Sequence, residues 1–487
     1  MSVAKAASAG AWSAIDIVLR QGVQFVVSII LARLLVPEDF GVMALLAFFT
    51  SLSIVFVQGG LSMALVQRQY TTPEQETAVF WTNLCAGILF ALILIAIAPW
   101  VARFYGYPLM DPLMYVVAAQ VVLSSLGAVQ SSLLTRTLRF DQLTKTGILS
   151  SVISGVLGVA AAMNGWGIWA LALQILSQAA IGSAALWWVI DWRPAWRVRF
   201  ASIRDLIGFG AHLSLSSVLE VVYAQGFILI IGKVYGARDL GFLSRATSIQ
   251  NLPTGIVSAV IARTALPLFA ARFADKDALL RGFRMSVGLA MLLSMPLMAG
   301  LAVLSDLIVL VLLGDKWMPA APVLAVAAVG GVLLPLHVLN LQLLLAGGES
   351  RAFLKLEVQK KAVGIVCFGT GCFYGIMGIA YASVVFSVLA YWLNARPTKA
   401  TLGWGIARQL ADLRGIVAAT LFMAAGVLAL KPVMPFPPLI SLCLLVAAGG
   451  ALYLGFGFAA RIRAFREAFD TAMLLVRRTP SEDASAR

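Results

Sequence analysis

Several ionisable and amide side chains of this 487-residue chain lie inside long apolar segments, where they recur every four residues. Residues four apart share one face of a helix. The first such face holds Trp12, Asp16, Arg20 and Gln24, and the matching face 200 residues later holds His212, Ser216, Glu220 and Ala224. An ionisable group at membrane depth is costly and usually faces an internal cavity, so these faces are predicted to contact a ligand.

Arg20 and Glu220 occupy matching positions near the middle of their segments. A cavity role is predicted for both, because their depth prevents the side chains from reaching the headgroups. The alternative is local: Asp16 and Arg20 neutralise each other across one turn, and Glu220 finds a nearby donor. Asp16 and Glu220 are also the candidates for coupling to a proton or sodium gradient.

Further polar stripes occur at helical spacing in two other apolar segments. They comprise Gln120, Ser124 and Ser131 in one segment, and Arg245, Thr247, Gln250, Asn251 and Thr254 in the other. Such residues also bind helices to one another, so packing and ligand contact both remain open for each of them.

Basic residues near the segment ends allow two interpretations. Arg263 can meet a phosphate or only lipid headgroups, and Lys355 can belong to a basic vestibule or to a solvated helix end. Glu357 is predicted to pair with Lys361 at i,i+4, which would leave Lys360 free. His337 is predicted to be a satisfied core residue.

The composition indicates an integral membrane protein. Hydrophobic residues make up 61% of the chain and charged residues 12%, and the mean hydropathy is +0.93, whereas soluble domains carry about 25% charged residues. The small residues at the N-terminus precede the first apolar run, which is therefore predicted to be a retained span and not a cleaved signal peptide. Cys85, Cys367, Cys372 and Cys443 lack metal-binding spacing and are predicted to pack; no metal or cofactor is expected.

The predicted fold class is all-α, a polytopic membrane protein with about 14 transmembrane helices. The predicted spans are roughly 11–34, 41–66, 77–103, 113–135, 144–163, 167–190, 206–231, 240–265, 283–312, 319–346, 353–374, 376–394, 413–430 and 438–460. The C-terminal tail resembles a short basic amphipathic helix followed by a polar stub.

The positive charges predict the orientation. Most of the 36 Lys and Arg residues fall on the segments that share a side with the N-terminus; the other side holds Arg33, Arg103, Lys233, Arg238, Lys316 and Lys431. The positive-inside rule therefore predicts that both termini are cytoplasmic. Contact between these cations and anionic headgroups accounts for the net charge of +14, so membrane lipids and not nucleic acid are the predicted partners.

An internal repeat organises the chain. A shift of 200 residues superposes PEDFG at 37–41 on ARDLG at 237–241. Each stretch is predicted to be a tight external corner, in which Pro37 ends one helix, Asp39 caps the next and Gly41 lets backbones pass closely. The repeat predicts a six-helix bundle at 1–198, a second at 199–398, and two extra helices with a basic tail at 399–487.

The motifs LARLLVPEDFGVMAL, GLSMALVQRQYTT, FWTNLCAG, APWVARFYGYP, LLTRTLRFDQL and GWGIWALALQ resemble those of bacterial polysaccharide flippases. That family is the colanic acid exporter-like, exopolysaccharide and O-antigen branch of the multidrug/oligosaccharidyl-lipid/polysaccharide exporter superfamily. The resemblance implies two bundles around a central cavity. It also implies translocation of an undecaprenyl-diphosphate-linked sugar repeat unit from the cytoplasmic to the periplasmic leaflet of the bacterial inner membrane, for exopolysaccharide or lipopolysaccharide synthesis.

With that substrate, cations at membrane depth would bind the diphosphate, since Arg matches phosphate through its planar fork. Arg20 and Arg245 are the candidates, with Arg263 and Lys355 nearer the entrance. Sugar hydroxyls would bind the polar stripes, which include Gln24, Gln120, Ser124, Gln250 and Asn251. A polysaccharide polymerase and chain-length machinery are candidate partners.

Two other functions fit a chain of this kind. A drug or cation antiporter of the same fold would favour an acidic, aromatic cavity, and a membrane polysaccharide polymerase or ligase would carry a large external loop with catalytic groups. The external connections here are short, without histidine or clustered carboxylates, and no nucleotide-binding loop or nucleophile triad is present. No enzymatic activity is predicted.

Overall fold

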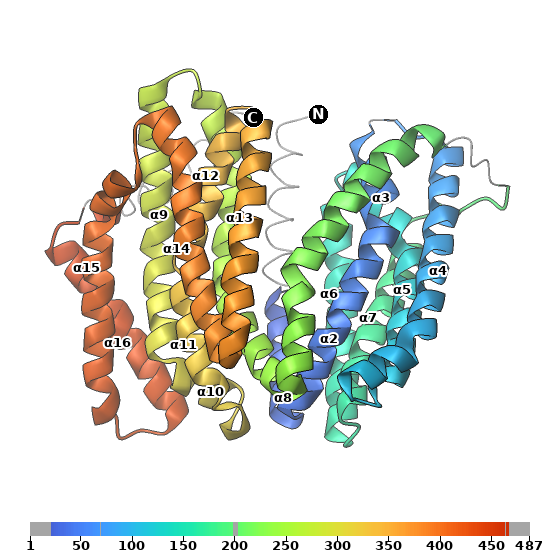
Figure 1. The fold of residues 1–487 in the computed structure, drawn as a ribbon, viewed down its shortest axis with the longest axis horizontal. Helices are drawn as coiled ribbons and strands as arrows, with labels where there is room; N and C mark the ends of the chain where they lie inside the picture. The colour runs from blue at the N-terminus through green and yellow to red at the C-terminus, as the bar shows by residue number, and fades with distance from the viewer. Residues whose placement is uncertain (1–20, 69, 198–202, 463, 467–487) are drawn as a thin grey trace, which may run out of the picture. The chain divides into compact units, whose positions relative to one another are not determined.

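A computed structural model describes residues 21–68, 70–197, 203–462 and 464–466, and over these ranges the chain is helical and contains no strand (Figure 1). Among the described residues, eleven helices are long and apolar enough to cross a membrane. The all-α, polytopic fold class is thus confirmed. The chain forms two compact units, Met1–Ser244 and Arg245–Arg487.

The eleven long helices account for the predicted spans because two of them are double. Leu213–Arg272 and Arg351–Leu402 each cover two predicted spans. The backbone breaks at Gly236, with φ 83°, and at Gly375, with φ 74°, a region that glycine adopts without steric cost. The first predicted span is represented in the described residues by the shorter helix Gln21–Leu34.

The first unit contains the helices up to the first part of α8. They are Gln21–Leu34, α2 (Pro37–Ile54), α3 (Leu61–Gln67), α4 (Pro73–Tyr105), α5 (Met110–Arg136), α6 (Phe140–Met163), α7 (Ile168–Val189) and α8 (Arg204–Arg272), which continues into the second unit. Helix α5 packs against α4 and α7, and α6 packs against α7.

The second predicted span is not one helix. A π-helical turn at Val55–Gly59 separates α2 from α3. Such turns need an extra residue in the helix and cannot be read from hydropathy, because apolar residues continue on both sides of the turn and Gln58 is its one polar residue.

The predicted external corners pack against each other through their glycines. A Cβ atom on Gly41 would lie 1.7 Å from the carbonyl oxygen of Ala237, and one on Gly241 would lie 2.0 Å from that of Pro37. The 200-residue repeat pairs Gly41 with Gly241 and Pro37 with Ala237, so the two contacts are equivalent and reciprocal. The close approach predicted at Gly41 is confirmed.

Side chains around the corners support this contact. The backbone N–H of Val36, the N-cap residue of α2, donates to Asp39 Oδ2 at 3.4 Å. Asp39 thus contributes to the cap from the third helical position and is not itself the N-cap residue. Pro37 starts α2, however, and does not end the preceding helix, which stops at Leu34. The phenol oxygen of Tyr107 accepts a hydrogen bond from the backbone N–H of Ala237 at 2.9 Å.

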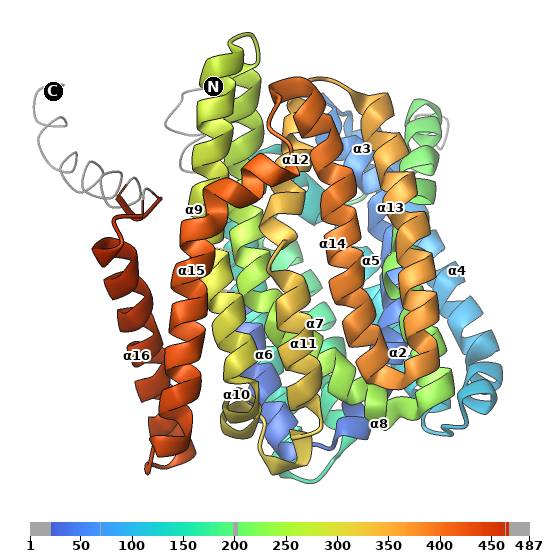
Figure 2. The ribbon, with the colours of Figure 1, turned by 60° about the vertical axis from the view of Figure 1, so that its left-hand side comes forward.

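The second unit contains the rest of the chain. Its helices after α8 are α9 (Lys276–Val303), α10 (Ser305–Leu312), α11 (Ala320–Gly331), α12 (Leu334–Ala346), α13 (Ser350–Gly371), α14 (Gly375–Leu402), α15 (Ile406–Leu430) and α16 (Pro438–Ala459). Short 3-10 turns lie at Asp315–Trp317, Cys372–Tyr374 and Lys431–Val433. Figure 2 shows the two extra C-terminal helices, α15 and α16, beside α9, and α15 contacts both of the others.

Two predicted spans of the second unit are broken helices. The span at 283–312 divides between α9 and α10 near Leu304, and the span at 319–346 divides between α11 and α12. Pro335 stands in the first turn of α12, where a missing N–H costs no hydrogen bond. The predicted domain boundaries at 198/199 and 398/399 remain a prediction, since the compact units divide inside α8.

We expect Gly41→Ala to destabilise the protein by about 1–3 kcal/mol, the usual cost of overpacking. The added methyl group would displace the backbone of Ala237. The measurement is the unfolding free energy in detergent micelles. Gly226→Ala is the matched control, because no atom lies within 4 Å of its would-be Cβ atom.

A double variant tests whether the two glycines make one contact. Gly41→Ala and Gly241→Ala together should cost less than the sum of their separate costs, because either one already separates the corners. Equal stability of Gly41→Ala and Gly226→Ala would contradict the close packing.

Candidate functional site

Four of the predicted site residues lie on helix surfaces within their unit. Gln24 and Glu220 are exposed in the first unit, and Asn251 and Lys355 are exposed in the second. Glu220 shares its exposed face of α8 with Ser216 and Ala224, as the four-residue spacing predicted. These side chains are thus available to a molecule outside the helix bundle to which they belong.

Three other predicted site residues lie within helix packing. Gln120 and Ser124 of α5 are partly buried, and Gln250 of α8 is buried. The Gln250 amide packs so closely on α11 that a Cβ atom on Gly331 would lie 2.4 Å from its Nε2. The Oε1 atom of Gln120 is enclosed without a hydrogen-bond partner among the described residues.

The predicted arginines are less fully defined. Arg245 is partly buried. Arg263 belongs to α8, but its side chain is not among those described, and Asp16 and Arg20 lie outside the described residues. Their predicted roles stay predictions.

A polar contact at membrane depth that the sequence analysis missed joins α8 to α2. Gln225 Nε2 donates to Ser51 Oγ at 2.9 Å, while Gln225 Oε1 is enclosed without a partner among the described residues. Ser51 is the repeat counterpart of Asn251, which was in the predicted set. This equivalence in the repeat was the sequence signal that could have identified Ser51.

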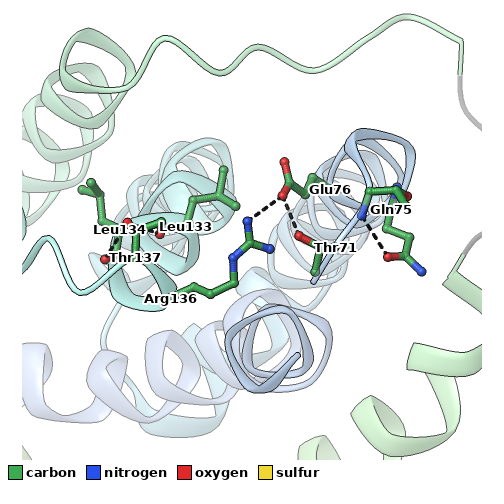
Figure 3. A network of polar contacts seen from close by, with 8 residues as sticks. Thr71, Gln75, Glu76, Leu133, Leu134, Arg136 and Thr137 are labelled. Carbon is green, nitrogen blue, oxygen red and sulfur yellow. Dashed lines mark hydrogen bonds and ion pairs between the residues drawn. The ribbon is translucent and has the colours of Figure 1, made fainter. Parts of the chain in front are cut away.

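A second missed feature is a buried ion pair between the start of α4 and the end of α5 (Figure 3). Arg136 Nη2 lies 2.9 Å from Glu76 Oε1, and the two side chains are 21% and 9% exposed. The same carboxylate oxygen accepts a hydrogen bond from Thr71 Oγ1 at 2.6 Å. The pair fixes the adjoining ends of two long helices.

Aromatic residues pack beside this ion pair, at the same end of α4. Trp81 Nε1 donates to the carbonyl oxygen of Ala195 at 3.0 Å, and Thr77 Oγ1 accepts from the N–H of Ala195 at 3.4 Å. Phe80 makes edge contacts with Trp187 and Trp192. The segment after α7 is thereby held against α4.

The second unit contains a buried polar network between α12 and α14. The His337 ring nitrogens lie 3.3 Å from Ser387 Oγ and 3.1 Å from Asn394 Nδ2, and Thr398 donates to Asn340. The prediction that His337 is a satisfied core residue is confirmed. Its partners are hydroxyl and amide groups, so the network has no acid–base pair.

Two smaller predictions about side chains were wrong. Glu357 pairs with Lys360, three residues later, so Lys360 is not free. Cys85 and Cys443 are exposed on their helices and not packed inside, because apolar residues can face either lipid or protein. Among the described residues, no group of three or more His, Cys, Asp or Glu side chains could hold a metal ion.

Each of the two units carries hydrogen-bonding and charged side chains on helix surfaces at membrane depth. The described polar clusters are structural contacts, made of ion pairs, amides and hydroxyls. This suits binding and passage of a polar group through the membrane.

We expect Glu76→Gln to cost at least about 2 kcal/mol of stability, because it leaves Arg136 mostly buried without its counter-charge. Breaking a buried pair typically costs about 3–5 kcal/mol, and the residual exposure of Arg136 lowers that value. The measurement is the unfolding free energy, with Glu76→Gln, Arg136→Gln and the double variant compared in a cycle.

The exposed pair of the same unit is the control. Arg238 and Glu38 lie 3.5 Å apart, with side chains 66% and 44% exposed, so Glu38→Gln should cost less than about 1 kcal/mol. Equal effects of Glu38→Gln and Glu76→Gln would show that the buried pair does not stabilise the helix ends.

Known proteins were compared with the whole chain. The profile of the family described as "Polysaccharide biosynthesis protein" matches residues 30–322. The teichuronic acid biosynthesis protein TuaB of Bacillus subtilis is 27% identical over 413 residues, which cover 82% of this chain and 85% of TuaB. The succinoglycan biosynthesis transport protein ExoT of Rhizobium meliloti is 28% identical over 325 residues, which cover 66% of each chain.

The fold also has a solved counterpart. The lipid II flippase MurJ, in its inward closed conformation, superposes with a TM-score of 0.77 at 13% sequence identity, covering 92% of this chain and 98% of MurJ. The likeness shows that this chain shares the fold of MurJ. Since the family profile matches more than half of this chain, the chain belongs to the polysaccharide biosynthesis protein family.

Proposed function

We propose that this chain moves an undecaprenyl-diphosphate-linked oligosaccharide repeat unit from the cytoplasmic to the periplasmic leaflet of the bacterial inner membrane. The product would serve exopolysaccharide or lipopolysaccharide synthesis. The family membership, the named transport function of ExoT and the fold shared with a lipid II flippase support this proposal. The step breaks no covalent bond, and we assign no enzymatic activity to the chain.

The observation that carries the proposal is the exposure of polar side chains at membrane depth. Gln24, Glu220 and Asn251 are exposed within apolar helices. Contact of a carboxylate or an amide with lipid chains is costly, whereas a hydrated path for a sugar headgroup accommodates both. The proposal therefore places these three side chains on the path.

Each part of the substrate has candidate partners. Arg20 and Arg245 would bind the diphosphate through their guanidinium forks. Arg263 and Lys355, nearer helix ends, would receive the headgroup at the entrance. Gln24 and Asn251 would bind sugar hydroxyls. Gln120, Ser124 and Gln250 lie within helix packing, so they would reach the substrate only when helices separate.

Transport in one direction requires an energy source and an enzyme that uses the translocated unit. Asp16 and Glu220 are our candidates for coupling to a cation gradient, because carboxylates bind protons or sodium and change charge on doing so. A polysaccharide polymerase with its chain-length machinery would consume the translocated unit. Alternating access would expose the site to each side of the membrane in turn.

We expect Arg20→Ala, Arg245→Ala and Glu220→Gln to reduce transport about tenfold or more, since a hydrogen bond to a charged group contributes about 1.5–3 kcal/mol. The readout is accumulation of lipid-linked repeat units in cells that lack the wild-type gene, together with loss of surface polysaccharide. Protein in the membrane fraction is quantified for each variant.

Arg396→Gln is the matched control for removal of a cation. Arg396 is exposed, stacks 3.5 Å above the Trp392 ring and lies outside the proposed path. Normal export by Arg20→Ala and Arg245→Ala would remove the diphosphate assignment. Normal export after deletion of the gene would remove the proposed function itself.

The proposed orientation has a separate test in a variant whose four native cysteines are replaced by alanine. A membrane-impermeant thiol reagent added to spheroplasts, whose outer barrier is removed, should label Asn164→Cys, between α6 and α7, and Pro435→Cys, between α15 and α16. Arg139→Cys, between α5 and α6, should be labelled only after the membrane is permeabilised. The opposite pattern would invert the topology.

A further inference from the structure

A pocket of about 250 Å³ lies in the second unit, where α9 and α15 run side by side. It is lined by charged side chains near the first turns of both helices and by apolar side chains further along them. Residue 464, after α16, also lines it. None of the residues discussed above as substrate contacts lines this pocket.

Charged and polar groups form one end of the pocket. Arg284 of α9 holds Asp412 of α15 through two bonds of 2.9 Å, from Nε to Oδ2 and from Nη2 to Oδ1. Trp404 Nε1 also donates to Asp412 Oδ2, at 3.1 Å. The carboxylate is therefore occupied on both oxygens and adds little repulsion against a second anion.

Arg281 stands one turn before Arg284 on α9 and is exposed at the pocket. Hydrogen bonds from the backbone N–H groups of Ala278 and Asp277, with the positive charge of Arg281, lower the pKa of the Asp275 carboxyl. The positive charge of Arg281 thus acts on Asp275, directly before the first residue of α9. Exposed arginines also flank the pocket in sequence; they are Arg408, Arg414, Arg461 and Arg466.

The other end of the pocket is apolar. Val287, Leu413 and Ile416 are buried lining residues. On α9 Val287 follows Arg281 by six residues, and on α15 Leu413 and Ile416 follow Asp412 by one and four residues. A helix rises about 1.5 Å per residue. The pocket therefore changes from cationic to apolar over about 10 Å, as the membrane does between headgroup and acyl chain.

We propose that this pocket binds an anionic phospholipid, with the phosphate at Arg281 and the upper acyl chains against Val287, Leu413 and Ile416. A basic pocket between membrane helices at the level of the headgroups matches such a lipid in charge and in polarity. The volume is slightly below the about 300–1,000 Å³ typical of ligand pockets, so it suits a headgroup and the first part of the chains.

The lipid would lie between α15, one of the two extra C-terminal helices, and α9. Arg284 and Asp412 join α9 to α15 by an ion pair at the polar end of the pocket. A bound lipid would fill the space between this ion pair and the apolar end. The lipid composition of the membrane would therefore influence how tightly α15 and α16 pack against α9.

The test is native mass spectrometry of the full chain in detergent, with phosphatidylglycerol and phosphatidylcholine of identical acyl chains as probes. We expect the wild type to retain phosphatidylglycerol preferentially. Arg281→Gln should weaken that binding about tenfold, because it removes a charge-assisted contact to phosphate.

Gly288→Leu is the second variant, because it keeps every charge. Gly288 lines the pocket, and the nearest atom to its would-be Cβ atom is Ala464 Cβ at 4.0 Å, so a leucine side chain fills the pocket without a backbone clash. It should abolish retention of the lipid. Arg351→Gln, an exposed arginine of α13, is the control and should retain it.

Three results would overturn the proposal. Equal retention of the two lipids would show only an apolar groove. Displacement of the lipid by inorganic phosphate at millimolar concentration would show a site for free anions. Unchanged phosphatidylglycerol binding by Gly288→Leu would place the lipid elsewhere. Each outcome is independent of transport activity, since the readout is binding alone.

Discussion

The structure depends on one constraint: the interior of a membrane supplies no water to satisfy polar groups. Every backbone N–H and C=O in a span must find a partner in the chain, which is why the described spans are helices. Side-chain hydroxyls obey the same constraint. Ser53 and Thr144, for example, donate to carbonyl oxygens four residues earlier in their own helices, each at 2.8 Å.

Larger polar groups need partners on other helices, and their placement follows from how many partners they require. The Asn83 amide reaches the Ser62 hydroxyl at 2.9 Å within the bundle. A full charge needs more, and Glu76 satisfies it with Arg136 and Thr71 at adjoining helix ends. Gln24, Glu220 and Asn251 instead lie on helix surfaces at membrane depth. This difference in placement separates these three candidates for transport from the structural polar residues.

Small residues determine how closely the helices approach. Without a hydrophobic drive between helices in lipid, association relies on close van der Waals packing. Gly41 and Gly241 provide this at the two corners, where each lies against the backbone of the other corner. The two contacts are equivalent under the register of 200 residues that the PEDFG and ARDLG stretches share. A larger residue in either copy would separate both.

The sequence by itself determined the apolar segments, the repeat, the close backbone approach at Gly41 and the family, because hydropathy, turn residues and motifs are properties of neighbouring residues. Local pattern also predicted that Ser216, Glu220 and Ala224 share one helix face and that His337 is satisfied. It did not reveal the π-helical turn before α3 or the breaks between α9 and α10, since helices bend there without a change in hydropathy. Only the tertiary structure decided which polar residues are packed and which are open. Glu76 and Arg136 are 60 residues apart, and Gln250 is enclosed by α11; such contacts depend on how helices lie against one another, which no local pattern records.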